Sequence, residues 1–325
     1  DLVSTHRKVK IFTMEKDEED ILPIWIDYHA DLVGYDNLYI IDNYSRQESQ
    51  TILIKYQQRG VHVYWRSDYR QKGDYICQLI QDNSQACDLA IPLDIDEFIG
   101  AINTADQLGL TESHPTINKY CQSHQQGKLI FIDVPKDQLP QTMSCHKDDI
   151  ITILNRLPNY GRYSFCYYLT TCNRQLSYHN PILEMTDFQL VDNSPNNKKF
   201  FQPKLLQSLD HGHHYGKVMG LERYDYLTVP LCLFHFHHRG VDRLITKCKN
   251  DILGLGYISS HEFYNDQLFR TLINQHVVGS HNLETYLKYR LEGPYALIYF
   301  GHNTIKITTM SQWVRTTFSD AVVKF

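Results

Sequence analysis

Several features that would each define a class of protein are missing from this sequence of 325 residues. No apolar run approaches the ~20 residues that a membrane-spanning helix needs. No G-x-G-x-x-G or Walker-type loop follows any expected strand, which leaves a dinucleotide-binding or P-loop protein without support. The net charge of −5 disfavours nucleic acid as the main partner, because a phosphate-tracking surface needs a clustered excess of lysine and arginine. What remains is a globular chain long enough to bury a sizeable core.

The eight cysteines are scattered without a C-x-x-C pair, which favours a reduced setting over a disulfide framework. The one N-glycosylation sequon, Asn43-Tyr44-Ser45, falls in a loop that is expected to face a ligand, where a glycan would obstruct binding. The first residue is Asp1 rather than Met, so we expect the start to be a domain boundary. We expect a cytoplasmic protein, either free or peripheral to the inner face of a membrane.

Strands and helices alternate through the first hundred residues, which is the pattern of a parallel α/β sheet. Strands are expected at residues 9–13, 38–42, 61–65 and 89–95. Three helices are expected between these strands. The first begins near Ile21, the second follows Ser45-Arg46-Gln47-Glu48, which has the spacing of a capping box, and the third covers about residues 71–85. Ligands of such sheets bind beyond the carboxyl ends of the strands. These ends carry Thr13, Asp42, Ser67, Asp94 and Asp96.

The most informative segment is Leu89 to Phe98, which has the pattern of a buried strand that stops at two carboxylates. Alternation along a strand points Asp94 and Asp96 the same way. Two neighbouring carboxylates repel each other unless a cation lies between them, and such oxygen ligands suit Mg²⁺ or Mn²⁺ carrying a substrate phosphate. An acidic strand end before a turn is the alternative for the motif alone. A phosphatase is disfavoured, since its aspartate motif is expected after the first strand.

A late segment, residues 228–239, offers further ligands. If it forms a strand, one of its faces carries two buried leucines followed by two imidazoles, in the order Leu231, Leu233, His235 and His237. Imidazole is an acceptable ligand of Mn²⁺, although carboxylates suit that ion better. The alternative is that His235 is a histidine satisfied within the core.

Three segments together resemble a known family. They are Ile24-Trp25-Ile26-Asp27-Tyr28-His29 after an acidic turn, Ile41-Asp42-Asn43-Tyr44-Ser45, and Leu93-Asp94-Ile95-Asp96-Glu97-Phe98-Ile99. On these residues the chain resembles the GT-A glycosyltransferases of the family 2 type, and most of all the group related to family 92, also called the DUF23-like group. The resemblance continues more faintly through residues 199–203, 211–213 and 233–239, with Lys247, and reaches about Gly256.

The resemblance implies a GT-A fold, in which a mostly parallel, Rossmann-like nucleotide-sugar-binding sheet is flanked by helices. It also implies a nucleotide-sugar donor, with UDP expected, a Mn²⁺ or Mg²⁺ ion, and transfer of a sugar, expected to be a hexose, to a hydroxyl of a glycan or glycolipid acceptor. A bacterial or viral surface polysaccharide is the expected product. A catalytically silent carbohydrate- or nucleotide-binding scaffold of the same fold is the alternative function.

The same resemblance assigns roles to individual residues. It implies that the nucleoside is held by Thr13, Glu15 and Asp42. The implied metal residues are Asp94, Asp96 and His235. Asp96 is the main ligand, Asp94 binds the ribose or a metal-bound water, and His235 completes the metal shell. Arg70 and Lys72 are expected to neutralise the diphosphate, or else to be solvated side chains before a helix.

An inverting transfer needs a carboxylate that takes the proton of the acceptor hydroxyl. Glu184 is the preferred base and Asp187 the fallback, although a helix start on the surface would explain both acids equally well. The irregular segments 121–168 and 193–201 are expected to be acceptor-side loops.

For domains, we expect a GT-A domain over residues 1–256, with a donor half at about 8–100 and an acceptor half at about 101–256. Residues 257–325 are expected to form a C-terminal helical extension packed on that domain. Its residues 283–291 have an amphipathic helical pattern. The extension is either an extra packing layer or a contact surface for another domain or subunit.

Overall fold

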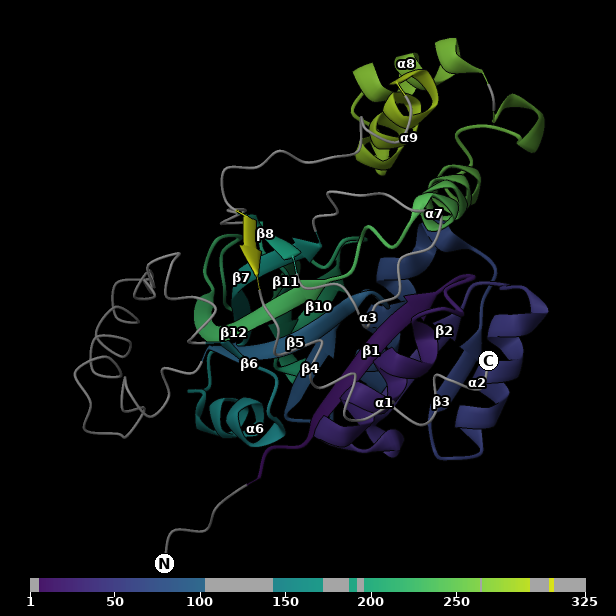
Figure 1. Ribbon diagram of the computed structural model, residues 1–325. Coiled ribbons are helices and arrows are strands. Elements are labelled where there is room, and N and C mark those ends of the chain that lie inside the picture. Colours follow the sequence, from purple (N-terminus) through teal and green to yellow (C-terminus); the bar gives the residue numbers. More distant parts are fainter. Residues whose placement is uncertain are drawn as a thin grey trace, which may run out of the picture.

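The computed structural model describes residues 6–102, 143–171, 187–191, 196–263, 265–292 and 304–306 (Figure 1). The strands are β1 Val9–Glu15, β2 Leu38–Asp42, β3 His62–Trp65, β4 Leu89–Pro92, β5 Glu97–Ile102, β6 Met143–Ser144, β7 Arg162–Thr171, β8 Asp187–Val191, β9 Lys199–Phe201, β10 Leu206–Leu209, β11 Gly216–Val218, β12 Leu227–His235 and β13 Thr304–Lys306. The α-helices are α1 Leu22–Val33, α2 Gln47–Gln57, α3 Lys72–Asp82, α6 Lys147–Arg156, α7 Val241–Gly254, α8 Asp266–Asn274 and α9 Ser280–Glu292.

One large sheet runs through the described part of the chain in the order β3-β2-β1-β4-β9-β7-β12-β5-β6, with β8 on β7 and β13 on β8. The first four strands are parallel, and their order 3-2-1-4 is that of a Rossmann-like half. Beyond β4 the sheet is extended by antiparallel pairs, while β7 and β12 are parallel to each other. The prediction of an α/β fold with a parallel, Rossmann-like sheet flanked by helices is confirmed.

Helices on both faces bury β1 along its whole length. Val9 and Ile11 belong to the larger core, to which α1, α2 and α6 contribute their apolar faces. Phe12 and Met14 belong to a second core beneath α3 and the β10–β11 hairpin. This alternation with a period of two is why the carboxyl end of β1 is held firmly between two layers.

Helix α1 follows the sequence expectation closely. Pro23 lies in its first turn, where a missing N–H costs little, and Trp25 and Tyr28 are fully buried. The indole Nε1 of Trp25 donates a hydrogen bond of 2.9 Å to the carbonyl of Glu97. This bond fixes α1 against the start of β5.

Three local expectations were wrong. Strand β4 ends at Pro92, so the two aspartates lie in the turn to β5, closed by a 3.1 Å bond from the Glu97 N–H to the Asp94 carbonyl. Helix α2 has Arg46 as its N-cap and no capping box, because the Ser45 hydroxyl bonds to Glu15 instead. The segment expected to be an irregular loop over residues 121–168 contains α6 and most of β7.

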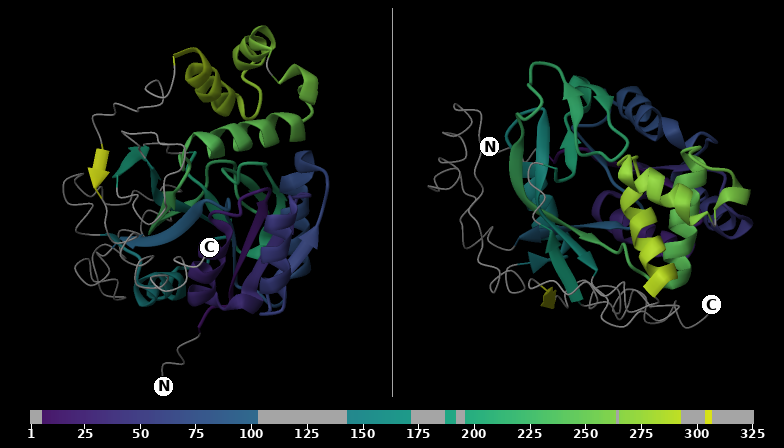
Figure 2. Two further views of the ribbon diagram at one scale, coloured as in Figure 1. Left: turned by 45° about the vertical axis from the view of Figure 1, so that its right-hand side comes forward. Right: turned by 90° about the horizontal axis from the view of Figure 1, so that it is seen from above.

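The last helices form a layer of their own above the sheet (Figures 1 and 2). Residues of α7, α8 and α9 share a separate apolar core that includes Cys248, Phe263, Phe269 and Leu283. The expected helix at residues 283–291 is confirmed as part of α9. No helix in the described residues is long and apolar enough to cross a membrane.

Acidification is expected to destabilise the fold through His29, which is fully buried in α1. Burial lowers the pKa of His29 to about 3, from the 6.5 of an ordinary histidine. The unfolded chain therefore takes up the proton first, and the free energy of unfolding should fall with decreasing pH between these two values, by up to ~1.4 kcal/mol per pH unit. The free energy of unfolding should be measured by denaturant titration at several pH values in this range. It should depend less steeply on pH for His29→Gln than for the wild type, and an identical pH dependence would contradict the assignment.

Candidate active site

A cavity of about 500 Å³ lies at the carboxyl ends of the strands, within the size range of small-molecule sites. Its lining includes the ends of β1 and β12, Tyr168 of β7 and the turn between β4 and β5. Its opposite wall comes from α7 and α9 and includes Asp251, His281 and Asn282. The C-terminal helices therefore supply part of the cavity that the sheet opens into.

Asp94 is held by two buried lysines from distant parts of the chain. Its carboxylate oxygens lie 2.5 Å from Lys72 Nζ in α3 and 2.7 Å from Lys198 Nζ, which precedes β9. Burial opposes ionisation of Asp94, but the ammonium groups of Lys198 and Lys72 outweigh it and hold the pKa well below its usual range. Asp94 is therefore a charged anchor for two lysines, as well as a cavity residue.

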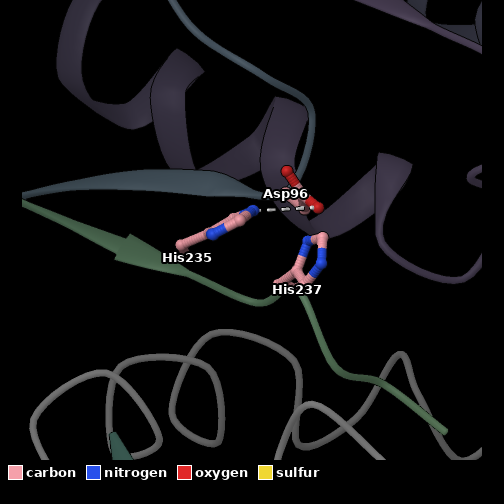
Figure 3. A group of neighbouring side chains, drawn as sticks. All are labelled: Asp96, His235 and His237. Atoms are coloured by element: carbon pink, nitrogen blue, oxygen red, sulfur yellow. Dashed lines mark ion pairs between the residues drawn. The ribbon is translucent and has the colours of Figure 1, made fainter. Parts of the chain in front are cut away.

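Asp96 faces a different set of groups from Asp94. Figure 3 shows two of these groups, His235 and His237, beside Asp96. One ligand atom from each of these three residues lies within 4.8 Å of the others. Asp96 Oδ2 is 3.3 Å from His235 Nε2 and 2.6 Å from Lys247 Nζ. Although Asp96 is deeply buried, the ammonium group of Lys247 keeps the pKa of Asp96 well below its usual range.

The Asp96 cluster, meaning Asp96, His235 and His237, fits a divalent cation. The second oxygen of Asp96, Oδ1, is buried and has no hydrogen-bond partner among the described residues. A carboxylate and two imidazoles are ligands that first-row divalent metals accept. Asp94 lies outside this cluster, so the two aspartates of the motif serve different neighbours.

The charge of the cavity points the same way. The described lining contains six acidic side chains and four lysines: Glu15, Glu18, Asp94, Asp96, Asp210 and Asp251 with Lys16, Lys72, Lys198 and Lys247. Burial raises the pKa of Glu15, Glu18 and Asp251, so the number of acids overstates the negative charge. Lys72, Lys198 and Lys247 are paired with the two aspartates, and Lys16 bonds the Asn43 carbonyl at 3.1 Å. A diphosphate entering the cavity would need additional positive charge, which a divalent cation provides.

The acidic run after β1 is held by arginines at the start of α7. Arg239 is almost fully buried and pairs with Glu18 and with Asp20, the latter at 2.8 Å. Arg243 pairs with Glu19 at 2.7 Å. Burial raises the pKa of Glu18 to about 7 despite the opposing charges of Arg239 and Lys247. These pairs join the loop after β1 to the end of β12, next to Asp96.

The residues expected around the nucleoside lie at the ends of β1 and β2. Glu15 and Asp42 are partners in the parallel register, and Glu15 lines the cavity. Burial and the neighbouring Asp42 raise the pKa of Glu15 well above its usual range. Thr13 and Asp42 are fully buried and do not line the cavity. Tyr44, in the loop after β2, has a φ of 53°, a left-handed backbone rarely adopted by a bulky residue.

The remaining predicted site residues are distributed as follows. Lys72 lines the cavity, whereas Arg70 is exposed and pairs with its neighbour Asp68 at 3.0 Å. Glu184 lies outside the described residues. Asp187 is the first residue of β8, and its side chain is not described.

Among the residues near the cavity that were not assigned roles from the sequence are His237, Lys198, Tyr168 and Asp251. His237 could have been, because its spacing from His235 placed it on the same face. Lys198 lay in a run of asparagines and lysines that indicated only a loop. Tyr168 lay at the end of the other segment expected to be a loop, residues 121–168, and Asp251 carried no local signal. The structure holds Asp251 between Tyr69 at 3.1 Å and Asn282 at 2.6 Å.

No protein-family model and no curated protein matches the chain. Among solved structures, a glucosyl-3-phosphoglycerate synthase from Mycobacterium tuberculosis, in complex with Mn²⁺ and uridine diphosphate, is similar over 28% of this chain and 34% of its own, with 18% identity and a TM-score of 0.21. A mannosyltransferase from Pyrobaculum calidifontis, in complex with GDP-Man and Mn²⁺, is similar over 98% and 77%, with 10% identity and a TM-score of 0.33. A cytidylyltransferase from Leptospira borgpetersenii is similar over 83% and 96%, with 13% identity and a TM-score of 0.31. TM-scores this low do not establish a common fold, so the function must rest on the chemistry of the site itself.

Proposed function

We propose that the protein is a metal-dependent, inverting GT-A glycosyltransferase, similar to the group related to family 92. It would move a hexose from a nucleotide-diphosphate sugar, with UDP the expected nucleotide, to a hydroxyl of a glycan or glycolipid. The observation that carries the proposal is the Asp96 cluster with its unpartnered carboxylate oxygen, in a cavity at the carboxyl ends of parallel strands. The resemblance of the segment around Asp94 and Asp96 to that family supports it.

Within this proposal, Asp96, His235 and His237 hold a Mn²⁺ or Mg²⁺ ion. When bound, that ion would neutralise the charge that develops on the departing diphosphate. Lys72 and Lys198, which are fixed by Asp94, line the same cavity and orient the donor phosphates. Glu15, with Asp42 and Thr13 behind it, would face the nucleoside.

The proposal also covers location and partners. A cytoplasmic enzyme acting on a surface polysaccharide would meet its acceptor at the inner face of a membrane. The C-terminal helices line the cavity, and we propose that residues 257–325 contribute to acceptor binding or to a contact with another domain or subunit.

A panel of nucleotide diphosphates tests donor binding directly. UDP, GDP and dTDP, each with Mn²⁺, should be compared by the shift in melting temperature, because a ligand that binds only the native state stabilises it. We expect one nucleotide to give a Mn²⁺-dependent shift. Release of that nucleotide from its sugar donor, again only with Mn²⁺, would exclude the silent scaffold. Binding without any release under acceptor-rich conditions would favour the scaffold.

Glu184→Gln is expected to slow transfer by roughly 10²- to 10⁴-fold while donor binding survives, because glutamine keeps the shape and removes the basic group. Transfer rates and the donor-induced melting shift should be measured on the same variant, with Asp187→Asn as the comparison. An NMR spectrum of the product should show the anomeric configuration opposite to that of the donor.

Different outcomes move the base elsewhere. Normal transfer by Glu184→Gln with an inactive Asp187→Asn would place the base at Asp187. If both variants remain active, Asp251 becomes the next carboxylate to test, since it lines the cavity and burial raises its pKa. A product that keeps the donor configuration would refute inversion.

A further inference from the structure

Three adjacent strands bring Glu97, Tyr168 and His235 together beside the cavity. Strand β12 lies between β5 and β7. In this register His235 is the partner of Glu97 on β5 and of Thr170 on β7, and Tyr168 is two residues before Thr170 on the same strand. The Tyr168 hydroxyl lies 2.9 Å from Glu97 Oε1 and 2.7 Å from His235 Nδ1.

Glu97 is surrounded by hydrogen-bond donors. Its Oε2 accepts the Asp94 N–H at 2.8 Å, and its Oε1 lies 3.4 Å from Lys198 Nζ in addition to the Tyr168 hydroxyl. A backbone N–H and an ammonium can only donate, so Glu97 acts as the acceptor. The single phenolic proton of Tyr168 is therefore directed to Glu97.

The consequence falls on His235. Since the phenolic proton is donated to Glu97, the Tyr168 oxygen can only accept a hydrogen bond from the imidazole of His235. Nδ1 of His235 must therefore carry a proton of its own. In a neutral imidazole this leaves Nε2 with its lone pair, and Nε2 is the atom 3.3 Å from Asp96 Oδ2. A lone pair facing a carboxylate is the arrangement that a cation between them would stabilise.

We propose that Tyr168 is a positioning residue, which together with Glu97 fixes His235 as the Nδ1–H tautomer so that Nε2 can bind a divalent cation. This inference rests on the metal site of the proposed function but not on the identity of the donor or acceptor. Hydrogen bonds to the far nitrogen of a metal-binding histidine orient the ring and raise its basicity as a ligand. Tyr168 lines the cavity and would act on the site through its bond to His235 Nδ1.

Tyr168→Phe tests the proposal, because it removes the hydroxyl and keeps the ring. We expect Mn²⁺ affinity, measured without donor from the free Mn²⁺ signal in electron paramagnetic resonance, to fall by roughly 10- to 100-fold. Tyr163→Phe is the matched control: Tyr163 lies on the same strand, and its hydroxyl donates to the Pro158 carbonyl at 2.7 Å, among residues that do not line the cavity. Its Mn²⁺ affinity should stay at the wild-type value.

Glu97→Gln provides a second and stricter variant. A glutamine amide can donate to the Tyr168 oxygen, which frees the phenolic proton for Nδ1 and favours the other tautomer. We expect weaker Mn²⁺ binding, and no further loss when Glu97→Gln and Tyr168→Phe are combined, since both act through one chain of bonds. The Thr170 hydroxyl lies 3.5 Å from the same nitrogen, so adding Thr170→Val to Tyr168→Phe removes this second acceptor for Nδ1 as well.

The tautomer itself is measurable by NMR of the metal-free protein labelled with ¹⁵N-histidine, in mildly alkaline buffer. The wild type should show His235 protonated on Nδ1, and Tyr168→Phe with Thr170→Val should move the proton to Nε2. A wild-type Nε2–H tautomer, or full Mn²⁺ affinity in that double variant, overturns the proposal. If the wild type binds no Mn²⁺ while the expected tautomer is present, the metal site of the proposed function fails and the hydrogen-bond relay stands.

Discussion

Replacing Asp96 with Asn should lower kcat roughly 10³-fold, which corresponds to a loss of about 4 kcal/mol of transition-state stabilisation. The same change should abolish saturable Mn²⁺ binding. Asp96 is the one carboxylate in the Asp96 cluster. The amide is isosteric but neutral, so the site would lose its anionic ligand while keeping the positive charges of Lys247 and Arg239 beside it. The measurements are kcat with the donor found in the nucleotide panel and Mn²⁺ binding without donor.

Asp94→Asn is the matched control, since it makes the same chemical change two residues away. Asp94 pairs with Lys72 and Lys198 and lies outside the Asp96 cluster. We expect Mn²⁺ affinity close to the wild type and weaker donor binding, because the lysines lose the anion that orients them. Retention of more than about a tenth of the wild-type kcat by Asp96→Asn, a loss below ~1.4 kcal/mol, would remove Asp96 from the metal site.

The first half of the fold could be predicted because its signals are local. Runs such as residues 38–42 and 89–92 are apolar, short and separated by amphipathic helices, which is what a sheet covered on both faces requires. The carboxyl ends of parallel strands meet at one edge, so the sequence alone indicated that Thr13, Asp42, Ser67, Asp94 and Asp96 lie near each other. Of these, Asp94 and Asp96 line the cavity, together with Glu15, which only the resemblance had named.

What could not be predicted depends on contacts between distant segments. Lys198 is 104 residues from Asp94, and no local pattern distinguishes it from the other polar residues of its loop. The relay from Glu97 through Tyr168 to His235 depends on the order β7-β12-β5, which mixes parallel and antiparallel pairs. Strand periodicity identifies a face but gives no pairing partner.

The turn that carries the two aspartates illustrates a further limit. Alternation along an uninterrupted strand predicted that Asp94 and Asp96 point the same way. Because β4 ends at Pro92, the chain turns between them, and each carboxylate meets its own cations. The residue types indicated a metal–phosphate site, but the backbone conformation decides that Asp96, and not Asp94, lies with His235 and His237 in the Asp96 cluster.

Arg239→Met should lower the free energy of unfolding by about 3–5 kcal/mol, the usual cost of removing one partner from a buried ion pair. The Arg239 side chain is 2% exposed and pairs with Glu18 and Asp20, and it donates a 2.7 Å bond to the Phe236 carbonyl. Methionine fills a similar volume but leaves these acceptors buried without their cation. Denaturant titration at neutral pH measures the loss.

Arg243→Met is the control, because Arg243 pairs with the same acidic run from a more exposed position. Its loss should stay near 1 kcal/mol, as for partly solvated pairs. Arg239→Lys should recover only part of the stability, since a single ammonium cannot make the forked contacts that a guanidinium makes to two carboxylates and a carbonyl. Equal losses for Arg239→Met and Arg243→Met would mean that the loop after β1 is held by the summed charge of the cluster rather than by the buried guanidinium.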